Sequence, residues 1–107
     1  AQLKKGVLDA CVLAAISKQD SYGYQILKDL RPYVAVSEST LYPILRRLET
    51  AEMLTVRTAE HNGRLRKYYH LTPQGLARIE QFKTEWGQIV NIYQFILSTE
   101  GTEHDES

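Results

Sequence analysis

The sequence predicts a mainly α-helical protein with one small two-stranded β hairpin. Apolar residues recur at helical spacing in three segments of the first half of the chain. The dipeptide Asn62-Gly63, which favours a two-residue hairpin turn, then lies between two short segments that are expected to be strands. In the last third, apolar residues follow a heptad-like stripe. This order predicts a winged helix-turn-helix followed by a long C-terminal helix.

The first two helices are expected over residues 3–16 and from Ser21 to Arg31. Ser21 is a plausible N-cap of the second helix, and Arg31-Pro32 ends it, because proline disfavours a helical residue before it. Gly23 would let this helix approach a neighbour closely. The apolar faces of the two helices consist of Val7, Leu8, Cys11, Val12, Ala15 and Ile16 in the first, and Ile26, Leu27 and Leu30 in the second.

The third helix is expected to follow Ser37, a second plausible cap. Pro43 cannot donate a backbone hydrogen bond, so either the first turn is kinked or the regular helix starts later than Ser37. At 100° per residue the helix separates an apolar side from a polar side that is free to contact a partner. The apolar side carries Leu41, Ile44, Leu45 and Leu48, and the polar side carries Ser39, Tyr42, Pro43, Arg46 and Arg47.

The hairpin turn at Asn62-Gly63 fixes a strand register. With these two residues in the turn, the expected opposite pairs are His61 with Arg64, Val56 with Tyr69, and Leu54 with Leu71. One face is then apolar. The other is a charged ribbon that carries Arg57, Arg64, Arg66, Tyr68 and His70, while Lys67 lies near the tip.

Thr72-Pro73 is typical of a helix start, so a long helix is expected from residue 73 to about Ser98. Its apolar stripe has a 3-4-3-4-3 spacing that suits a partner helix, and the chain is therefore expected to form a homodimer. We divide the chain into a DNA-binding unit over residues 1–72, a dimerisation helix over residues 73–98 and a disordered acidic tail over residues 99–107. The expected interface residues are Ile79, Phe82, Trp86, Ile89, Tyr93 and Ile96.

The charge, cysteine content and apolar runs of the chain limit the kinds of function that it can have. The 13 basic and 13 acidic residues balance, but the last nine residues hold four acidic and no basic side chains, so the remainder has 13 − (13 − 4) = +4 charges. Cys11 is the single cysteine, which excludes an intramolecular disulfide and a cysteine-based zinc cluster. We expect no metal and no cofactor. No apolar run approaches the roughly 20 residues that cross a bilayer, so no membrane association and a cytoplasmic location are expected.

A basic helix followed by a basic hairpin favours binding to double-stranded DNA, with the third helix in the major groove. Each side chain taken alone could be a solvated charge or a packing residue. The combination is more specific. The expected contacts are Ser39, Thr40, Tyr42, Arg46 and Arg47 on the helix, and Arg64, Arg66 and Lys67 on the hairpin, where they would attract phosphates.

Three motifs stand out along the chain: Tyr22-Gly23-Tyr24, then Thr40-Leu41-Tyr42-Pro43 through Arg47-Leu48-Glu49, and then Arg66-Lys67-Tyr68-Tyr69 through Leu71-Thr72-Pro73-Gln74-Gly75. With these motifs, nearly the whole chain resembles the PadR family of bacterial transcriptional regulators. The resemblance implies a dimeric winged helix repressor of the compact subgroup, with the C-terminal helix as interface, and two-fold symmetry suggests a palindromic operator.

Trp86 has two interpretations. Some proteins that look similar stack flat aromatic ligands on a tryptophan of this helix, and Gly87 would leave room for a small aromatic effector. The alternative, which we favour, is an interface anchor, because an aromatic residue on an apolar stripe usually packs.

Two alternatives to DNA binding are an enzyme and a winged helix that binds protein. An enzyme would have only His61, His70, Tyr68 and Tyr69 as acid, base or nucleophile candidates, and no recognisable catalytic motif accompanies them, so we expect no catalytic residues. A winged helix that binds protein would use the long helix for docking. The basic hairpin argues against it, and a strong salt dependence of binding would separate DNA from protein partners.

Overall fold

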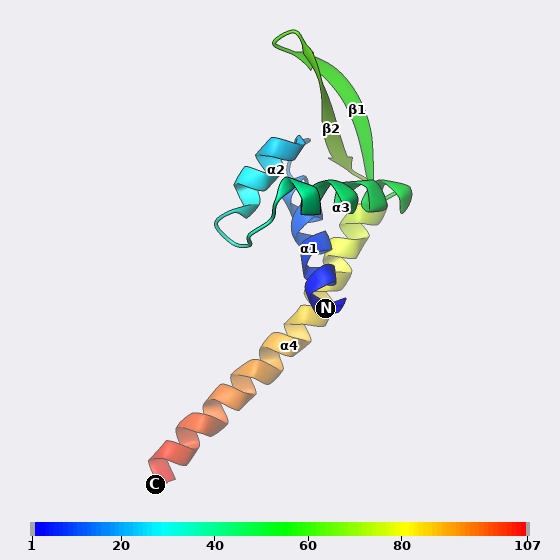
Figure 1. Ribbon diagram of the computed structural model, residues 1–107. Helices are drawn as coiled ribbons and strands as arrows, with labels where there is room; N and C mark the ends of the chain where they lie inside the picture. The colour runs from blue at the N-terminus through cyan, green and yellow to red at the C-terminus, as the bar shows by residue number, and fades with distance from the viewer. Residues whose placement is uncertain (1, 107) are drawn as a thin grey trace.

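The computed structural model describes residues 2–106, and the side chains of residues 6–99. It confirms the predicted fold class. In Figure 1 the first three helices gather around the start of the fourth, the hairpin projects from this group, and the fourth helix extends away as a rod. The molecule is therefore elongated, with principal extents of 68 × 25 × 25 Å. Its elements are α1 (Gln2–Ala15), α2 (Gly23–Leu30), α3 (Glu38–Thr50), β1 (Leu54–His61), β2 (Arg64–Leu71) and α4 (Pro73–Glu106).

The core lies where α1, α2, α3, the base of the hairpin and the start of α4 meet. The buried residues of α2 and α3 are those of the predicted apolar faces. In α1 the prediction was incomplete, because Ala10 and Leu13, which were not assigned to its apolar face, are buried, whereas Val7, Leu8, Cys11 and Ala15 are only half-buried. Burial of one large apolar side chain stabilises the fold by roughly 1.5–3 kcal/mol. The polar face of α3 is consequently turned to solvent. The central buried side chains are Val12, Leu13, Ile16, Ile26, Leu41, Leu45 and Leu54.

Ser37 caps α3 as predicted. Its hydroxyl accepts a hydrogen bond from the Thr40 backbone N–H at 3.3 Å. The helix begins directly at Glu38, so Pro43 lies inside it and the later start left open by the sequence is not adopted. Pro43 removes one intrahelical donor on the exposed side of the helix.

The prediction that Ser21 caps α2 is wrong. The N-cap position is Tyr22, whose side chain makes no capping hydrogen bond. Ser21 instead pairs its backbone with Tyr69 of β2, through N···O distances of 3.2 and 2.7 Å. Two backbone hydrogen bonds stabilise an extended Ser21 more than one side-chain cap would, and its hydroxyl is buried without a hydrogen-bond partner.

The hairpin has the predicted register. Leu54 lies opposite Leu71, Val56 opposite Tyr69, and His61 opposite Arg64. Asn62 and Gly63 have φ angles of 53° and 78°, which is the left-handed backbone that a type I′ turn requires.

The long helix begins where predicted but continues beyond the expected end near Ser98. Thr72 caps it, since its hydroxyl accepts from the Gly75 N–H at 3.1 Å. The helix runs to Glu106, which corrects the expectation of a disordered tail over most of residues 99–107; Ser107 lies outside the described residues. No proline interrupts residues 99–106, and adding a residue to an existing helix costs far less than starting one. No helix among the described residues is long and apolar enough to cross a bilayer.

A backbone prediction follows from the turn after α3. Glu52 has a φ of 63°, which is strained for a residue with a Cβ atom. We expect Glu52→Gly to raise the free energy of unfolding by roughly 0.5–1 kcal/mol, measured by urea denaturation. Gly63→Ala is the matched control. Its φ is 78° and an added Cβ meets no atom within 4 Å, so it should destabilise the protein by a similar amount through the backbone alone. An unchanged midpoint for both variants would contradict this explanation.

Candidate nucleic-acid interface

The exposed face of α3 carries four of the eight predicted contact residues. Ser39, Thr40, Tyr42 and Arg46 are all exposed, because Leu41 and Leu45 on the opposite side are buried in the core. Hydroxyl, phenol and guanidinium groups therefore lie together on one helix surface. Such a surface can donate hydrogen bonds to base edges and to phosphate oxygens.

Tyr42 is positioned by the close approach of α2. A Cβ atom added at Gly23 would collide with the Tyr42 ring and hydroxyl. Gly23 thus permits the helix contact that the sequence predicted, and Tyr42 is the residue that uses the space. The Tyr42 side chain is still 37% exposed, so its outer edge remains accessible.

Arg47 lies apart from the other polar residues of α3. Its guanidinium forms an ion pair and hydrogen bond with Asp9 of α1. The Arg47 side chain is 39% exposed and that of Asp9 is 20% exposed, so the pair is partly shielded from water. A helix position alone could not reveal this, because Asp9 is distant in sequence. Arg47 ties α3 to α1, and we omit it from the contacts proposed below.

The base of the hairpin is held by a stack of arginine and tyrosine side chains. The Arg66 guanidinium lies 3.8 Å from the ring centre of Tyr22, and Tyr22 packs edge-on against Tyr68 at 5.8 Å. The guanidinium of Arg57 lies over Tyr68 at 4.7 Å. Each guanidinium is attracted to the ring beside it and the two rings pack edge-to-face, so the stack holds the hairpin against the start of α2.

Asp20 adds an ionic contact to the same region. Its carboxylate lies 2.7 Å from His70 Nδ1 and accepts a hydrogen bond from Arg57 Nε at 3.3 Å. The hydrogen bond with His70, and then that with Arg57, lowers the pKa of Asp20, although desolvation opposes them. No local sequence pattern signals this contact, because Asp20 precedes α2 and both of its partners lie on the hairpin.

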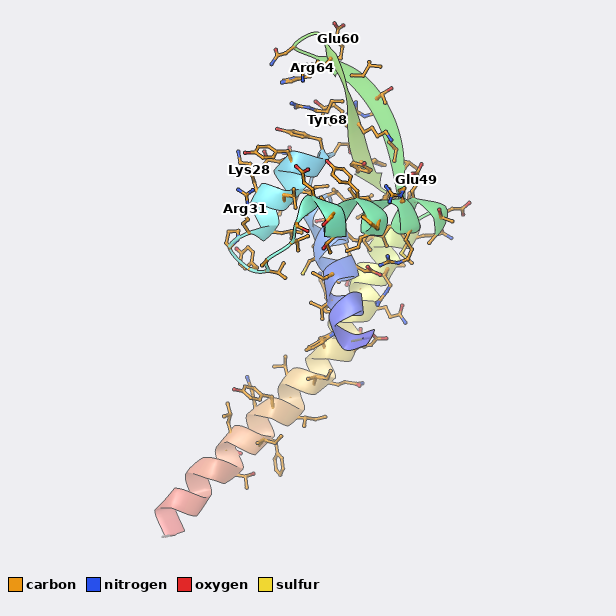
Figure 2. The ribbon with its side chains drawn as sticks, viewed as in Figure 1. Lys28, Arg31, Glu49, Glu60, Arg64 and Tyr68 are labelled. Carbon is orange, nitrogen blue, oxygen red and sulfur yellow. The ribbon has the colours of Figure 1, made fainter. Side chains whose placement is uncertain are left out.

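The hairpin cations differ in their environments. Arg64 is exposed near the tip, far from the helices, as Figure 2 shows. Arg66 is half-buried in the stack with Tyr22, and Lys67 is exposed on the face that Tyr69 shares. The structure therefore does not present the three as one uniform charged ribbon.

The apolar stripe of α4 divides into two parts. Ile79, the first residue of the predicted interface, is 8% exposed and lies in the hydrophobic core, so little of its surface is left for a partner. It packs inward because the start of α4 lies against α1. Phe82 and Trp86 are half-buried and stack at 5.5 Å with an interplanar angle of 30°.

The second half of α4 exposes a large apolar surface. Ile89, Tyr93 and Ile96 are 42%, 59% and 55% exposed. A contiguous exposed apolar surface of this kind marks an interaction site in most soluble proteins. Further exposed apolar side chains on this segment are Val90, Ile92, Phe95 and Leu97.

The four candidate acid, base or nucleophile residues have different surroundings. His61 lies beside the hairpin turn, whereas His70 lies at the opposite end of β2 and bonds to Asp20. Tyr68 belongs to the stack with Tyr22, and the ring of Tyr69 is buried in the core.

Comparisons with known proteins agree with this geometry. The family model described as the transcriptional regulator PadR-like family matches residues 12–81. A solved structure from Streptococcus mutans UA159 is 41% identical, with a TM-score of 0.80, over 87% of this chain and 88% of that chain. A PadR-like transcriptional regulator from Bacillus cereus strain ATCC 14579 is 35% identical, with a TM-score of 0.79, over 91% and 97%. Bacillus subtilis PadR, solved in complex with operator DNA, is 25% identical, with a TM-score of 0.67, over 71% of this chain and 46% of that chain.

The Asp20 contact predicts a pH dependence of stability. Because its pKa is lowered in the folded state, the contact stabilises the protein above the ordinary carboxyl range and is lost as the pH falls through the lowered value. Asp20→Asn should lower the melting temperature by a few degrees at pH 7, and the difference from wild type should narrow below about pH 4. A difference that stays constant from pH 7 to pH 3 would exclude a charged role for Asp20.

Proposed function

Because the chain belongs to the PadR-like family of transcriptional regulators, we propose that it acts as a homodimeric repressor that binds a palindromic operator. The observation that carries the proposal is the exposed polar face of α3, which lies beside a basic hairpin in a winged helix fold. In this proposal α3 enters the major groove and the hairpin follows the DNA backbone. The proposed contacts are Ser39, Thr40, Tyr42, Arg46, Arg64, Arg66 and Lys67.

The exposed apolar surface of α4 supports the dimer. A helix projecting from a small core, with Ile89, Tyr93 and Ile96 in water, gains stability when a partner covers these side chains. A second copy of the chain carries the same apolar surface, and two-fold pairing of the two α4 helices would cover both surfaces. Two α3 helices related by a two-fold axis would contact two half-sites of opposite orientation, hence the palindrome.

Trp86 supports an effector site as the second part of the proposal. Its ring is half-buried, and Gly87 beside it has open space around its Cα atom. A flat aromatic ligand can stack there between two protomers, and its binding would release the operator by altering the dimer. Trp86 is the only tryptophan, so quenching of its fluorescence reports on this site alone. Aromatic compounds that neither quench it nor affect operator binding would leave Trp86 as an interface anchor.

The experiment that tests DNA binding begins with selection of duplexes from a random pool. The affinity for the selected duplex and for a scrambled duplex is then measured by fluorescence anisotropy at two salt concentrations. We expect preference for the selected duplex and a steep loss of affinity with salt, because displaced counterions drive phosphate binding. No binding to either duplex at low salt would favour the alternative, a winged helix module that binds protein.

The dimer is tested by Tyr93→Asp. Tyr93 is 59% exposed in the protomer, so the substitution should leave the fold intact while it places a charge in the interface. Sedimentation at micromolar concentration should show a dimer for the wild type and a mainly monomeric variant. Asn91→Asp is the matched control, since residue 91 lies about 160° around the helix from residue 93. A dimer that survives Tyr93→Asp unchanged would place the interface elsewhere.

Base reading is tested by Arg46→Ala. If Arg46 contacts a base edge, the preference for the selected duplex should fall by roughly 1–3 kcal/mol, as measured by anisotropy on both duplexes. Arg47→Ala is the control within the same helix. Because Arg47 bonds to Asp9, its loss should lower the melting temperature and leave the preference unchanged. Equal losses of affinity on both duplexes for Arg46→Ala would make it a phosphate contact.

A further inference from the structure

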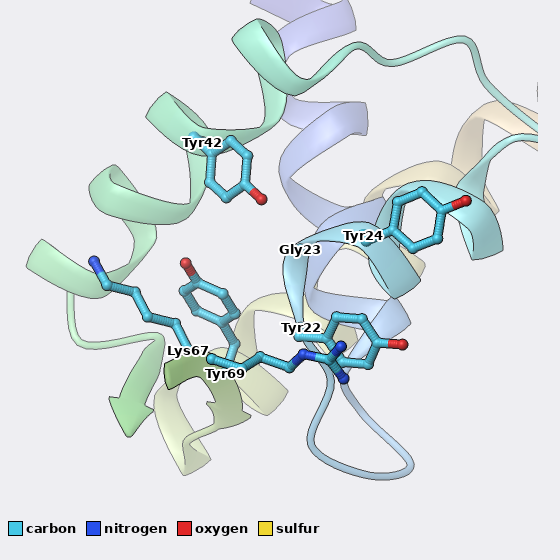
Figure 3. A pocket seen from close by; sticks show the side chains of 7 residues that line it. Tyr22, Gly23, Tyr24, Tyr42, Lys67 and Tyr69 are labelled. Carbon is cyan, nitrogen blue, oxygen red and sulfur yellow. The ribbon is translucent and has the colours of Figure 1, made fainter. Parts of the chain in front are cut away.

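A hollow of about 420 Å³ lies where the start of α2, the exposed face of α3 and β2 meet. Its lining combines phenol rings with cations, as Figure 3 shows. Tyr42 belongs both to the hollow and to the polar face of α3, so the two surfaces are continuous. The side chains that shape the hollow are Tyr22, Tyr24, Tyr42, Tyr69, Arg66 and Lys67.

The charge of this lining favours an anion. Two cations, Arg66 and Lys67, face the hollow, and none of its lining residues is acidic. An acidic residue outside the lining, Glu49 on α3, affects the pKa of Tyr69. Burial, and then the neighbouring Tyr42 and Glu49, raises the pKa of Tyr69, against an opposing effect of Arg46. The Tyr69 hydroxyl therefore stays protonated at neutral pH and can donate a hydrogen bond.

The hydrogen-bond donors around the hollow come from α3 and β2. In Figure 3 the Tyr42 side chain reaches from α3 toward Gly23 of α2, the Tyr69 hydroxyl points from β2 toward α3, and the Lys67 side chain extends toward α3. Arg66 is held against the Tyr22 ring at 3.8 Å, which fixes the plane of its guanidinium while its edge donors remain available. A tetrahedral anion can accept hydrogen bonds from several directions at once, which suits donors arranged in this way.

We propose that the hollow holds a single backbone phosphodiester of the operator in each half-site, and thereby sets the depth and register of α3 in the major groove. The proposal rests on the DNA-binding function proposed above. A helix in the major groove brings the backbone of the adjoining strand beside the elements that flank it, here α2 and the hairpin. Lys67 supplies the charge, and the Tyr42 and Tyr69 hydroxyls supply directed hydrogen bonds.

The test replaces each phosphate of the selected duplex, one at a time, by an uncharged methylphosphonate. With the wild-type protein we expect one position in each half-site at which affinity falls by roughly tenfold or more, since a charge-assisted hydrogen bond is lost there. Lys67→Gln should lower affinity for the unmodified duplex by a similar factor. It should then show less than about a twofold further loss at that same phosphate, because the interaction is already absent.

Two further variants separate a built site from general attraction. Arg64→Gln removes a hairpin cation that does not line the hollow, so it should weaken binding but keep the full sensitivity to that one phosphate. Tyr69→Phe keeps the buried ring and removes only the hydroxyl, so it should reduce that sensitivity in part. Thermal unfolding of all three variants checks that the fold is retained.

The outcomes are distinguishable. If wild type and Lys67→Gln lose the same factor at every phosphate, the duplex is bound but the hollow holds no particular phosphate, and the inference is overturned. If Arg64→Gln abolishes the sensitivity as Lys67→Gln does, the effect is general electrostatics. If the wild-type protein binds no duplex at low salt, the proposed function itself fails and the phosphate site fails with it.

Discussion

The backbone hydrogen bonds between Ser21 and Tyr69 fix the orientation of the hairpin relative to the helices. These two hydrogen bonds, with N···O distances of 3.2 and 2.7 Å, join the segment before α2 to β2. Tyr69 also places its ring in the core and its hydroxyl at the hollow beside α3. The hairpin therefore cannot pivot at its base without breaking backbone hydrogen bonds and withdrawing an aromatic ring from the core, both of which cost free energy.

Several arginines on the predicted polar faces of α3 and the hairpin make contacts within the chain. Arg47 bonds to Asp9, Arg57 bonds to Asp20, and Arg66 stacks on Tyr22. These contacts hold the arginine side chains in place and leave less positive charge free to attract phosphates. The count of basic residues on a predicted face thus overstates the number available to phosphates, because a guanidinium near a carboxylate or a ring is held there.

The continuity of α4 links the two parts of the proposed function. The helix begins in the core with Ile79 and leaves it with its apolar side chains exposed from Ile89 onward. A single uninterrupted helix from Pro73 to Glu106 is stiff, so the placement of its far half determines where the core and the hairpin lie. In the proposed dimer, the pairing of two such helices would set the distance between the two α3 helices.

The fold class, the amphipathic helices and the hairpin register could be predicted from the amino-acid sequence alone. These depend on local signals: periodicity for the helices, and Asn62-Gly63, which leaves only one pairing that matches Leu54 with Leu71. The Ser37 cap and the helix start at Pro73 were predictable for the same reason. The end of α4 was not, because the acidic segment after Ser98 contains no proline to stop the helix, and an established helix continues through it.

Which of the predicted surface residues face outward and which serve the fold depends on contacts between elements that are far apart in the chain. The positions of three residues were compatible with their predicted roles, but each makes a contact within the fold instead. Arg47 bonds to Asp9, Ile79 packs inward where α4 lies against α1, and Ser21 pairs its backbone with Tyr69. The hollow between α2, α3 and β2 likewise consists of residues far apart in the chain. Periodicity specifies the face of an element, whereas a partner on that face is specified by packing between elements that no local pattern encodes.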